Sequence, residues 1–254
     1  MSDRNIISVN LGSYGHFREG ALAHLAELGV RHVEIGVPKP EEVEEWTGRL
    51  TEYGLSATTL QCPCDLSEEP ETMRPSLEVG KAMGVGIFFV SVKAGEKLTK
   101  PQAYDRLRAR AEMADEYGIT LAMETHPDLG ENFNEARATI HAVAHPRLRW
   151  NLDTANLYYY NANMDAVETA KKGASLIAAV HLKDTNGAQR CWWFPALGDG
   201  VVDFGGVFGV LGAVGFRGPY TLELEGVEGR PLDEAGTKDQ VARSIAHLRA
   251  LGVF

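Results

Sequence analysis

The sequence predicts one α/β domain folded as a (β/α)8 barrel, also called a TIM barrel, and three observations support this. Eight short apolar segments recur along the chain, with segments of helical periodicity between them. The length of 254 residues is close to the roughly 250 residues typical of one such barrel. No GxGxxG motif follows the first apolar segment, and polar residues gather at the carboxyl ends of several strands. Both features favour a closed barrel over an open doubly wound sheet.

The expected strands are runs of apolar and β-branched residues that a parallel sheet would bury on both faces. In chain order they are Ile6–Asn10, His32–Ile35, Ser56–Gln61, Gly86–Val92, Thr120–Glu124, Leu148–Leu152, Ala178–Leu182 and Tyr220–Glu223. Their spacing leaves room for a helix between successive strands, as a parallel sheet requires.

The expected helices carry apolar residues at helical spacing, as Leu22, Leu25 and Leu28 do, and several end in glycine. Segments such as ELGVRHVEIG, EYGITLAME and VGFRGPYTLELE show a helix, a glycine and then a strand. Glycine adopts the left-handed C-cap conformation without steric cost. We therefore expect a single domain over residues 1–254, built from repeated helix–Gly–strand units. One long glycine-rich loop is expected at about residues 185–206, after the seventh strand, where it could form a lid.

Composition narrows the classes of function and partner. The chain is 44% hydrophobic and 24% charged, which is ordinary for a soluble protein, and it has no apolar run long enough for a membrane span. The opening MSDRNIISVN has no features of a secretory signal, so we expect a cytoplasmic protein. A net charge of −10 disfavours nucleic acid as a partner. The three cysteines fit neither a disulfide framework nor a zinc motif, so we expect free thiols.

Four polar residues stand at or near the ends of four successive expected strands. Glu124 occurs in LAMETHP, Asp153 in RWNLDTANL, His181 in AAVHLKD and Glu223 in YTLELEG. Each has an ordinary alternative, since a strand-end carboxylate can bind a backbone amide or an arginine and a lone histidine is usually a hydrogen-bonded core residue. These alternatives require a separate explanation for each of four neighbouring strands, whereas one shared site explains all four residues.

A divalent metal ion explains this convergence. Three carboxylates brought together would repel and raise one another's pKa values, whereas a bound cation removes that penalty. Oxygen ligands with one imidazole suit Mn²⁺, Mg²⁺, Co²⁺ or Zn²⁺, and the absence of a cysteine ligand argues against a structural zinc site. We expect one divalent ion, with Mn²⁺ as the first choice.

The segments ETHP, NLDTANL, VHLKD, GDGVVDF and GFRGPYTLELEG resemble the landmarks of xylose-isomerase-like TIM barrels. The resemblance is to sugar epimerases of the tagatose 3-epimerase type, inosose-processing enzymes and hydroxypyruvate isomerase. It covers strands five to eight; earlier in the chain, HVEIG with Glu34 is compatible with the family but not specific to it. The resemblance implies that Glu124, Asp153, His181 and Glu223 bind the metal and that Glu124 and Glu223 are also the acid/base catalysts.

The function implied is a metal-dependent isomerase or epimerase acting on a sugar, keto-sugar or cyclitol. Removing a proton beside a carbonyl produces an enediolate, whose charge a divalent ion stabilises while one glutamate takes the proton and another returns it.

Two positions depart from the family pattern. Asn156 stands where many epimerases have a histidine, three residues after the metal aspartate, and it can bind a sugar hydroxyl but cannot exchange a proton near pH 7. The arginine expected shortly after the metal histidine is missing, and Lys183 is the candidate cationic substrate contact in its place. The alternative is that Lys183 forms an ion pair with Asp184 at the barrel rim.

Two further substrate contacts are candidates. His126 lies two residues beyond Glu124, on the same side of an extended chain, unless it is simply a loop histidine. Trp192, in the long loop, could stack on a sugar, pack against the barrel or contact a second subunit. Exposed aromatics of this kind make a homo-oligomer such as a dimer conceivable.

Three alternatives remain open. A metal-dependent lyase or dehydratase acting on a 3-keto-sugar, keto-glycoside or inosose would use the same enolate chemistry and expel a leaving group. An endonuclease acting at abasic DNA sites shares the barrel but needs more histidine ligands and a basic groove. A catalytically inactive binding subunit would have no need of both Glu124 and Glu223. We expect a small carbohydrate as the substrate.

Overall fold

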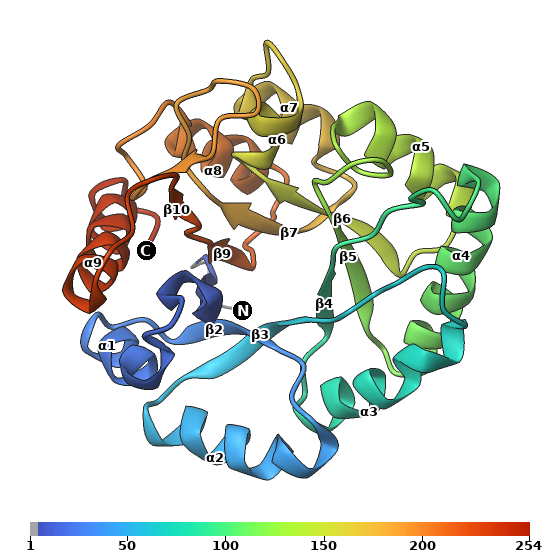
Figure 1. Ribbon diagram of the computed structural model, residues 1–254, viewed down its shortest axis with the longest axis horizontal. Helices are drawn as coiled ribbons and strands as arrows, with labels where there is room; N and C mark the ends of the chain where they lie inside the picture. Colours follow the sequence, from blue (N-terminus) through green and yellow to red (C-terminus); the bar gives the residue numbers. More distant parts are fainter. Residues whose placement is uncertain (1–4) are drawn as a thin grey trace.

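The computed structural model describes residues 5–254 and contains a closed barrel of eight parallel strands, with helices on its outside (Figure 1). Residues 1–4 begin the segment in which the sequence shows no features of a secretory signal, and they lie outside the described part. The strands, in barrel order, are β1 (Ile7–Asn10), β2 (His32–Gly36), β3 (Ser56–Gln61), β4 (Ile87–Val90), β5 (Thr120–Glu124), β6 (Leu148–Asp153), β7 (Ile177–Leu182) and β9 (Tyr220–Leu222). The predicted (β/α)8 fold is confirmed.

Helices follow the strands around the ring and bury one apolar face against the barrel. They are α1 (Ala21–Glu27), α2 (Val43–Glu52), α3 (Arg74–Ala82), α4 (Lys100–Glu116), α5 (Phe133–Val143), α6 (Asn156–Tyr160), α7 (Ala166–Gly173), α8 (Phe204–Ala213) and α9 (Glu234–Ala250). Two short 3-10 helices, η1 (Leu11–Tyr14) and η2 (Arg18–Gly20), follow β1, and η3 (Pro40–Glu42) and η4 (Pro70–Met73) precede α2 and α3. No helix within residues 5–254 is long and apolar enough to cross a membrane.

The expected helix–Gly–strand unit recurs in the structure. Gly29, Gly54, Gly84, Gly118 and Gly215 all have positive φ, between 64° and 83°, where a helix ends before the next strand. The amino end of α4 is fixed by a capping box: the Thr99 hydroxyl accepts the Gln102 backbone N–H, and the Gln102 side chain accepts the Thr99 N–H. These local signals explain why the element order could be predicted.

The core lies both inside the barrel and between the strands and helices. Trp150, Tyr220 and Phe88 are among its largest fully buried side chains. Phe208 of α8 stacks on Tyr220 of β9 with the ring centroids 4.1 Å apart. Cys62 and Cys64 are buried, and all three cysteines are free.

The loop after β7 differs from its expected form. Within it, β8 (Trp193–Phe194) pairs antiparallel with β10 (Gly226–Val227), which follows β9. α8 begins at Phe204, two residues before the predicted end of the loop at about residue 206. The Asp203 side chain caps that helix by accepting the Gly206 N–H at 2.8 Å.

Asp184 organises this loop from its buried start. Its carboxylate accepts backbone N–H groups from Thr185, Gly198, Gly200 and Val202, at 2.9, 2.9, 2.9 and 3.2 Å respectively. A Cβ at Gly200 would overlap this carboxylate and the Thr185 carbonyl oxygen. The loop is thus a folded segment held by one side chain.

Candidate metal centre

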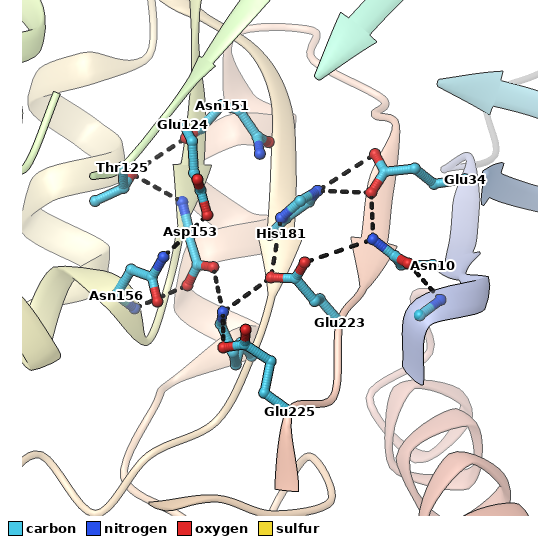
Figure 2. A network of polar contacts seen from close by, with 12 residues as sticks. Asn10, Glu34, Glu124, Thr125, Asn151, Asp153, Asn156, His181, Glu223 and Glu225 are labelled. Carbon is cyan, nitrogen blue, oxygen red and sulfur yellow. Dashed lines mark hydrogen bonds and ion pairs between the residues drawn. The ribbon is translucent and has the colours of Figure 1, made fainter. Parts of the chain in front are cut away.

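The four residues identified at the strand ends meet at one place in the barrel mouth (Figure 2). Glu124 ends β5, Asp153 ends β6, His181 lies next to last in β7, and Glu223 directly follows β9. One potential ligand atom from each lies within 4.8 Å of the others. The expected juxtaposition is therefore present.

Two threonines tie these strand ends together. Thr125 donates its hydroxyl to the Asn151 carbonyl at 3.1 Å and accepts the Asp153 N–H at 2.9 Å. Thr154 donates to the Lys183 carbonyl at 2.7 Å and accepts the Lys183 N–H at 3.0 Å. Each threonine directly follows a candidate ligand. Its side chain therefore adds hydrogen bonds between neighbouring strand ends to those of the sheet itself, and these hold the backbone next to the ligands.

Asp153 uses one carboxylate oxygen for the backbone and turns the other toward the site. Oδ1 accepts the N–H groups of Ala155 and Asn156, at 2.9 and 2.8 Å, where α6 begins. Oδ2 lies 2.9 Å from the Lys183 ammonium but has no hydrogen-bond partner of acceptable geometry within residues 5–254.

His181 is held by a buried glutamate on the other side of the barrel. Its Nε2 lies 3.1 Å from Glu34 Oε1, and Glu34 accepts hydrogen bonds from Asn10 Nδ2 and Thr59 Oγ1, each at 2.7 Å. This contact sets the orientation of the imidazole ring. His181 Nδ1 faces Glu223 Oε2 at 3.2 Å and has no hydrogen-bond partner among the described residues.

Lys183 lies inside the acidic cluster rather than at the rim. Its side chain is 1% exposed, and Nζ lies 2.9, 2.8 and 2.7 Å from carboxylate oxygens of Asp153, Glu223 and Glu225. The alternative of an ion pair with Asp184 is wrong, because successive residues of an extended chain point to opposite sides and Asp184 turns to the loop.

Sequence reasoning missed Glu225. Glu223 and Glu225 are two residues apart in LELEG, so both side chains lie on the same side of an extended chain. This two-residue spacing is the sequence feature that could have identified Glu225 as a residue of the site.

The two candidate acid/base glutamates differ in ionisation. Burial, together with the negative charge of Glu223, raises the pKa of Glu124 to about 7. Burial alone would also raise the pKa of Glu223, but the charges of Lys183 and His181 outweigh it and hold that pKa well below its usual range. Near neutral pH, one carboxyl group is thus partly protonated and the other is ionised.

A cavity of about 340 Å³ lies above Glu124 and Glu223. Three of the predicted substrate contacts, His126, Asn156 and Trp192, line it, whereas Lys183 is not part of the lining. Asn156 Nδ2 also donates to Glu124 Oε1 at 3.1 Å. Further lining residues that sequence reasoning did not assign to the substrate are Gln61, Phe89, Ser91, Tyr159, Tyr160 and Glu225.

Aromatic residues form one wall of this cavity. The rings of Tyr159 and Trp192 lie 5.9 Å apart, and Trp192 lies 5.1 Å from Phe194. Phe194 is buried and its ring covers the Lys183 ammonium at 5.1 Å. The loop after β7 therefore closes over the cluster, and Tyr158 instead turns away to accept the Ala166 N–H at 3.2 Å.

The residues present fit a divalent cation. Asp153 Oδ2 and His181 Nδ1 are buried, adjacent to the cluster and without hydrogen bonds in the described part of the chain. Around them, the carboxylates of Glu34, Glu124, Glu223 and Glu225 exceed the positive charge that Lys183 and His181 supply. A cation would satisfy both atoms and reduce the carboxylate repulsion.

Comparison with known proteins gives consistent matches. The family model described as "xylose isomerase-like TIM barrel" matches residues 22–251. The chain is 28% identical over 185 residues to L-ribulose-5-phosphate 3-epimerase UlaE of Escherichia coli and to its counterpart in Escherichia fergusonii. That match covers 69% of this chain and 63% of each relative, so it spans less than two thirds of their length.

Solved structures share the fold at low identity. A D-allulose 3-epimerase from Methylomonas sp. has a TM-score of 0.76 at 19% identity, with 98% of both chains covered. D-psicose 3-epimerase from Clostridium cellulolyticum H10, solved with D-tagatose, has a TM-score of 0.77 at 14% identity, covering 96% of this chain and 98% of that one. At such identities the similarity establishes the barrel alone.

Proposed function

Because the chain belongs to the xylose isomerase-like TIM barrel family, we propose that it is a divalent-metal-dependent sugar epimerase. The proposed reaction inverts the carbon next to the carbonyl of a ketose. One observation carries it: Glu124 and Glu223 reach the same cavity from β5 and β9, with β6 and β7 between them, and their pKa values are shifted in opposite directions. The names of the epimerase relatives agree with this choice.

The two glutamates have complementary tasks in this proposal. Glu223, ionised beside Lys183 and His181, accepts the proton from the substrate carbon. Glu124, whose pKa burial raises to about 7 in the metal-free protein, is the group that donates a proton to the other face of that carbon. In the reverse reaction the two exchange roles. Asn156 supports Glu124 through the hydrogen bond to Oε1 and binds a substrate hydroxyl with its free atoms.

The proposed ligands of the ion are Glu124, Asp153, His181 and Glu223, with Mn²⁺ as the first metal to test. When bound, a divalent ion stabilises the negative charge that develops beside the carbonyl. Lys183 holds the carboxylates of Asp153 and Glu223 in position from below, and His126 and Trp192 bind the sugar.

The test is proton exchange with solvent. Metal-loaded protein is incubated in D₂O with ketopentoses, ketohexoses, their phosphates, inososes and 3-keto-glycosides, and the products are analysed by NMR and mass spectrometry. We expect one deuterium at the inverted carbon of a ketose and no loss of a group. Release of water or an aglycone would replace the epimerase with the lyase alternative, and absence of exchange in every substrate would overturn both.

A pair of variants tests the role of Glu223. Glu223→Gln keeps the shape of the side chain but removes the base, so exchange should fall by about 10²- to 10⁴-fold. Glu52→Gln changes an exposed glutamate at the last residue of α2, at the end of the barrel opposite the mouth, and should leave the rate unchanged. Comparable exchange in both variants would contradict the assignment.

A further inference from the structure

A second cavity adjoins the catalytic one on the other side of Glu223. Its volume is about 630 Å³, and Gln61, Trp192, Glu223 and Glu225 line both cavities. Its remaining wall comes from the segment after β1, the segment after β9 and the first turns of α9. A ligand held at Glu124 and Glu223 can therefore extend beyond Glu223 without leaving the protein surface.

The size of this second cavity shows that the site can take more than the reacting carbons. Ligand pockets commonly measure about 300 to 1,000 Å³. The cavity at Glu124 lies at the lower end of that range, and the second is nearly twice as large. A substrate that extended from Glu124 into this cavity would place its remote end there.

The far wall of the second cavity is positively charged. Arg18, in η2, and Arg230, after β10, both line it, together with His16. Within residues 5–254 neither arginine takes part in an ion pair, so both guanidinium groups remain available to a ligand. The near wall carries Glu223 and Glu225. A ligand that fits both walls has a neutral polar end at the glutamates and an anionic end at the arginines.

Lys238 adds positive charge on the same side of the barrel. Its Nζ lies 3.4 Å from the position that a Cβ on Gly20 would take, at the end of η2. Lys238 is paired with Glu234 at 2.7 Å, so its charge is partly compensated, whereas those of the two arginines are not. In a chain with a net charge of −10, the two arginines place positive charge next to an acidic site.

We infer that the second cavity binds a phosphate monoester on the terminal carbon of the ketose, with Arg18 and Arg230 as its cationic contacts. This inference rests on the proposed epimerase function. Two guanidinium groups suit a phosphate because it carries a charge of about −1.5 to −2 and three acceptor oxygens. The segment after the last barrel strand is also a frequent phosphate site in this fold.

Binding of an unreactive ligand pair tests the inference. Mn²⁺-loaded protein is titrated calorimetrically with a pentitol 5-phosphate and with the same pentitol lacking phosphate. We expect the phosphate to bind at least about tenfold more tightly, because charge-assisted hydrogen bonds to arginine are lost without it. In the R18A/R230A double variant this preference should disappear, and both side chains are exposed, so the fold should be retained.

The control variant is Arg137→Ala, which removes an exposed arginine of α5 far from the second cavity and should keep the phosphate preference. Equal affinity for both pentitols in the unsubstituted protein would overturn the inference. A preference that survives in the double variant would overturn the assignment to Arg18 and Arg230. A pentonic acid that binds as tightly as the phosphate would overturn the choice of anion.

The binding experiment and the deuterium-exchange experiment can fail independently of each other. Pentitols cannot react, so their binding does not depend on turnover. Deuterium exchange without a phosphate preference would reject the second-cavity assignment alone. A phosphate preference without exchange in any ketose would reject the epimerase proposal alone.

Discussion

At the scale of single residues, Lys183 is the internal counter-charge of the candidate metal centre. Burial alone would lower its pKa, but the carboxylates of Asp153, Glu223 and Glu225 keep that pKa well above its usual value. A buried ammonium surrounded by carboxylates is costly to remove, because its partners then remain buried and unpaired.

We therefore predict that Lys183→Met destabilises the protein most when metal is withheld. With a chelator present, the free energy of unfolding should fall by about 3–5 kcal/mol. With Mn²⁺ the loss should be smaller, since a bound cation replaces part of the missing charge and binding stabilises the folded state. Urea unfolding under both conditions measures this. Lys172→Met, on the exposed face of α7, should change stability by less than about 0.5 kcal/mol. An equal loss with and without metal would contradict the prediction.

Glu124 gives a pH-dependent prediction for the metal-free protein. Its pKa in the folded state is raised to about 7 from an ordinary 4.5, so the folded protein binds this proton more tightly than the unfolded chain. The associated stability is complete below about pH 4.5 and is lost as pH rises to about 7. The unsubstituted protein should therefore lose about 3 kcal/mol of unfolding free energy between pH 4.5 and 8, relative to Glu124→Gln, which has no carboxyl group to titrate. Denaturant unfolding at both pH values, with chelator, checks the sign; a pH-independent difference would refute it.

Residues differ in how far sequence alone could assign them. Glu124, Asp153 and Glu223 could be found because strands of a barrel end at one mouth. Glu34 could not, since its contact with His181 joins residues 147 positions apart and depends on packing across the barrel. Lys183 was identified, but its burial among three carboxylates depends on side chains from β6 and the segment after β9.

At the scale of elements, the loop after β7 determines the shape of the cavity. Sequence composition predicted a long glycine-rich loop, but the two-residue strand β8 is too short to show any periodicity. Its pairing with β10 is also non-local. The role of Asp184 follows from four backbone N–H groups that no pattern in the sequence reveals.

A glycine pair tests this loop. Gly200→Ala should destabilise the protein by about 1–3 kcal/mol, because the added methyl group overlaps the Asp184 carboxylate and forces the loop to shift. Gly209→Ala, within α8, meets no atom within 4 Å and should stabilise the helix by up to about 1 kcal/mol. Thermal unfolding of both variants gives the comparison. Similar melting temperatures would show that Asp184 does not fix the loop as described.

At the scale of the whole molecule, the barrel brings together residues from distant parts of the chain. Strand bounds agree with the sequence prediction to within two residues, because each strand is flanked by a local glycine or helix signal. The two cavities could not be predicted, since they arise between loops that follow different strands. The fold was therefore more predictable than the substrate pocket.

The central claim is that Glu124, Asp153, His181 and Glu223 bind one divalent ion, and Mn²⁺ titration of the metal-free protein followed by electron paramagnetic resonance tests it most directly. We predict one bound Mn²⁺ per chain. Asp153→Ala should weaken binding by more than about 100-fold, since changes that merely support a ligand already cost about 10- to 100-fold. Asp105→Ala, on the exposed side of α4, should bind like the unsubstituted protein. Absence of Mn²⁺ binding, or binding that Asp153→Ala leaves unchanged, would contradict the account.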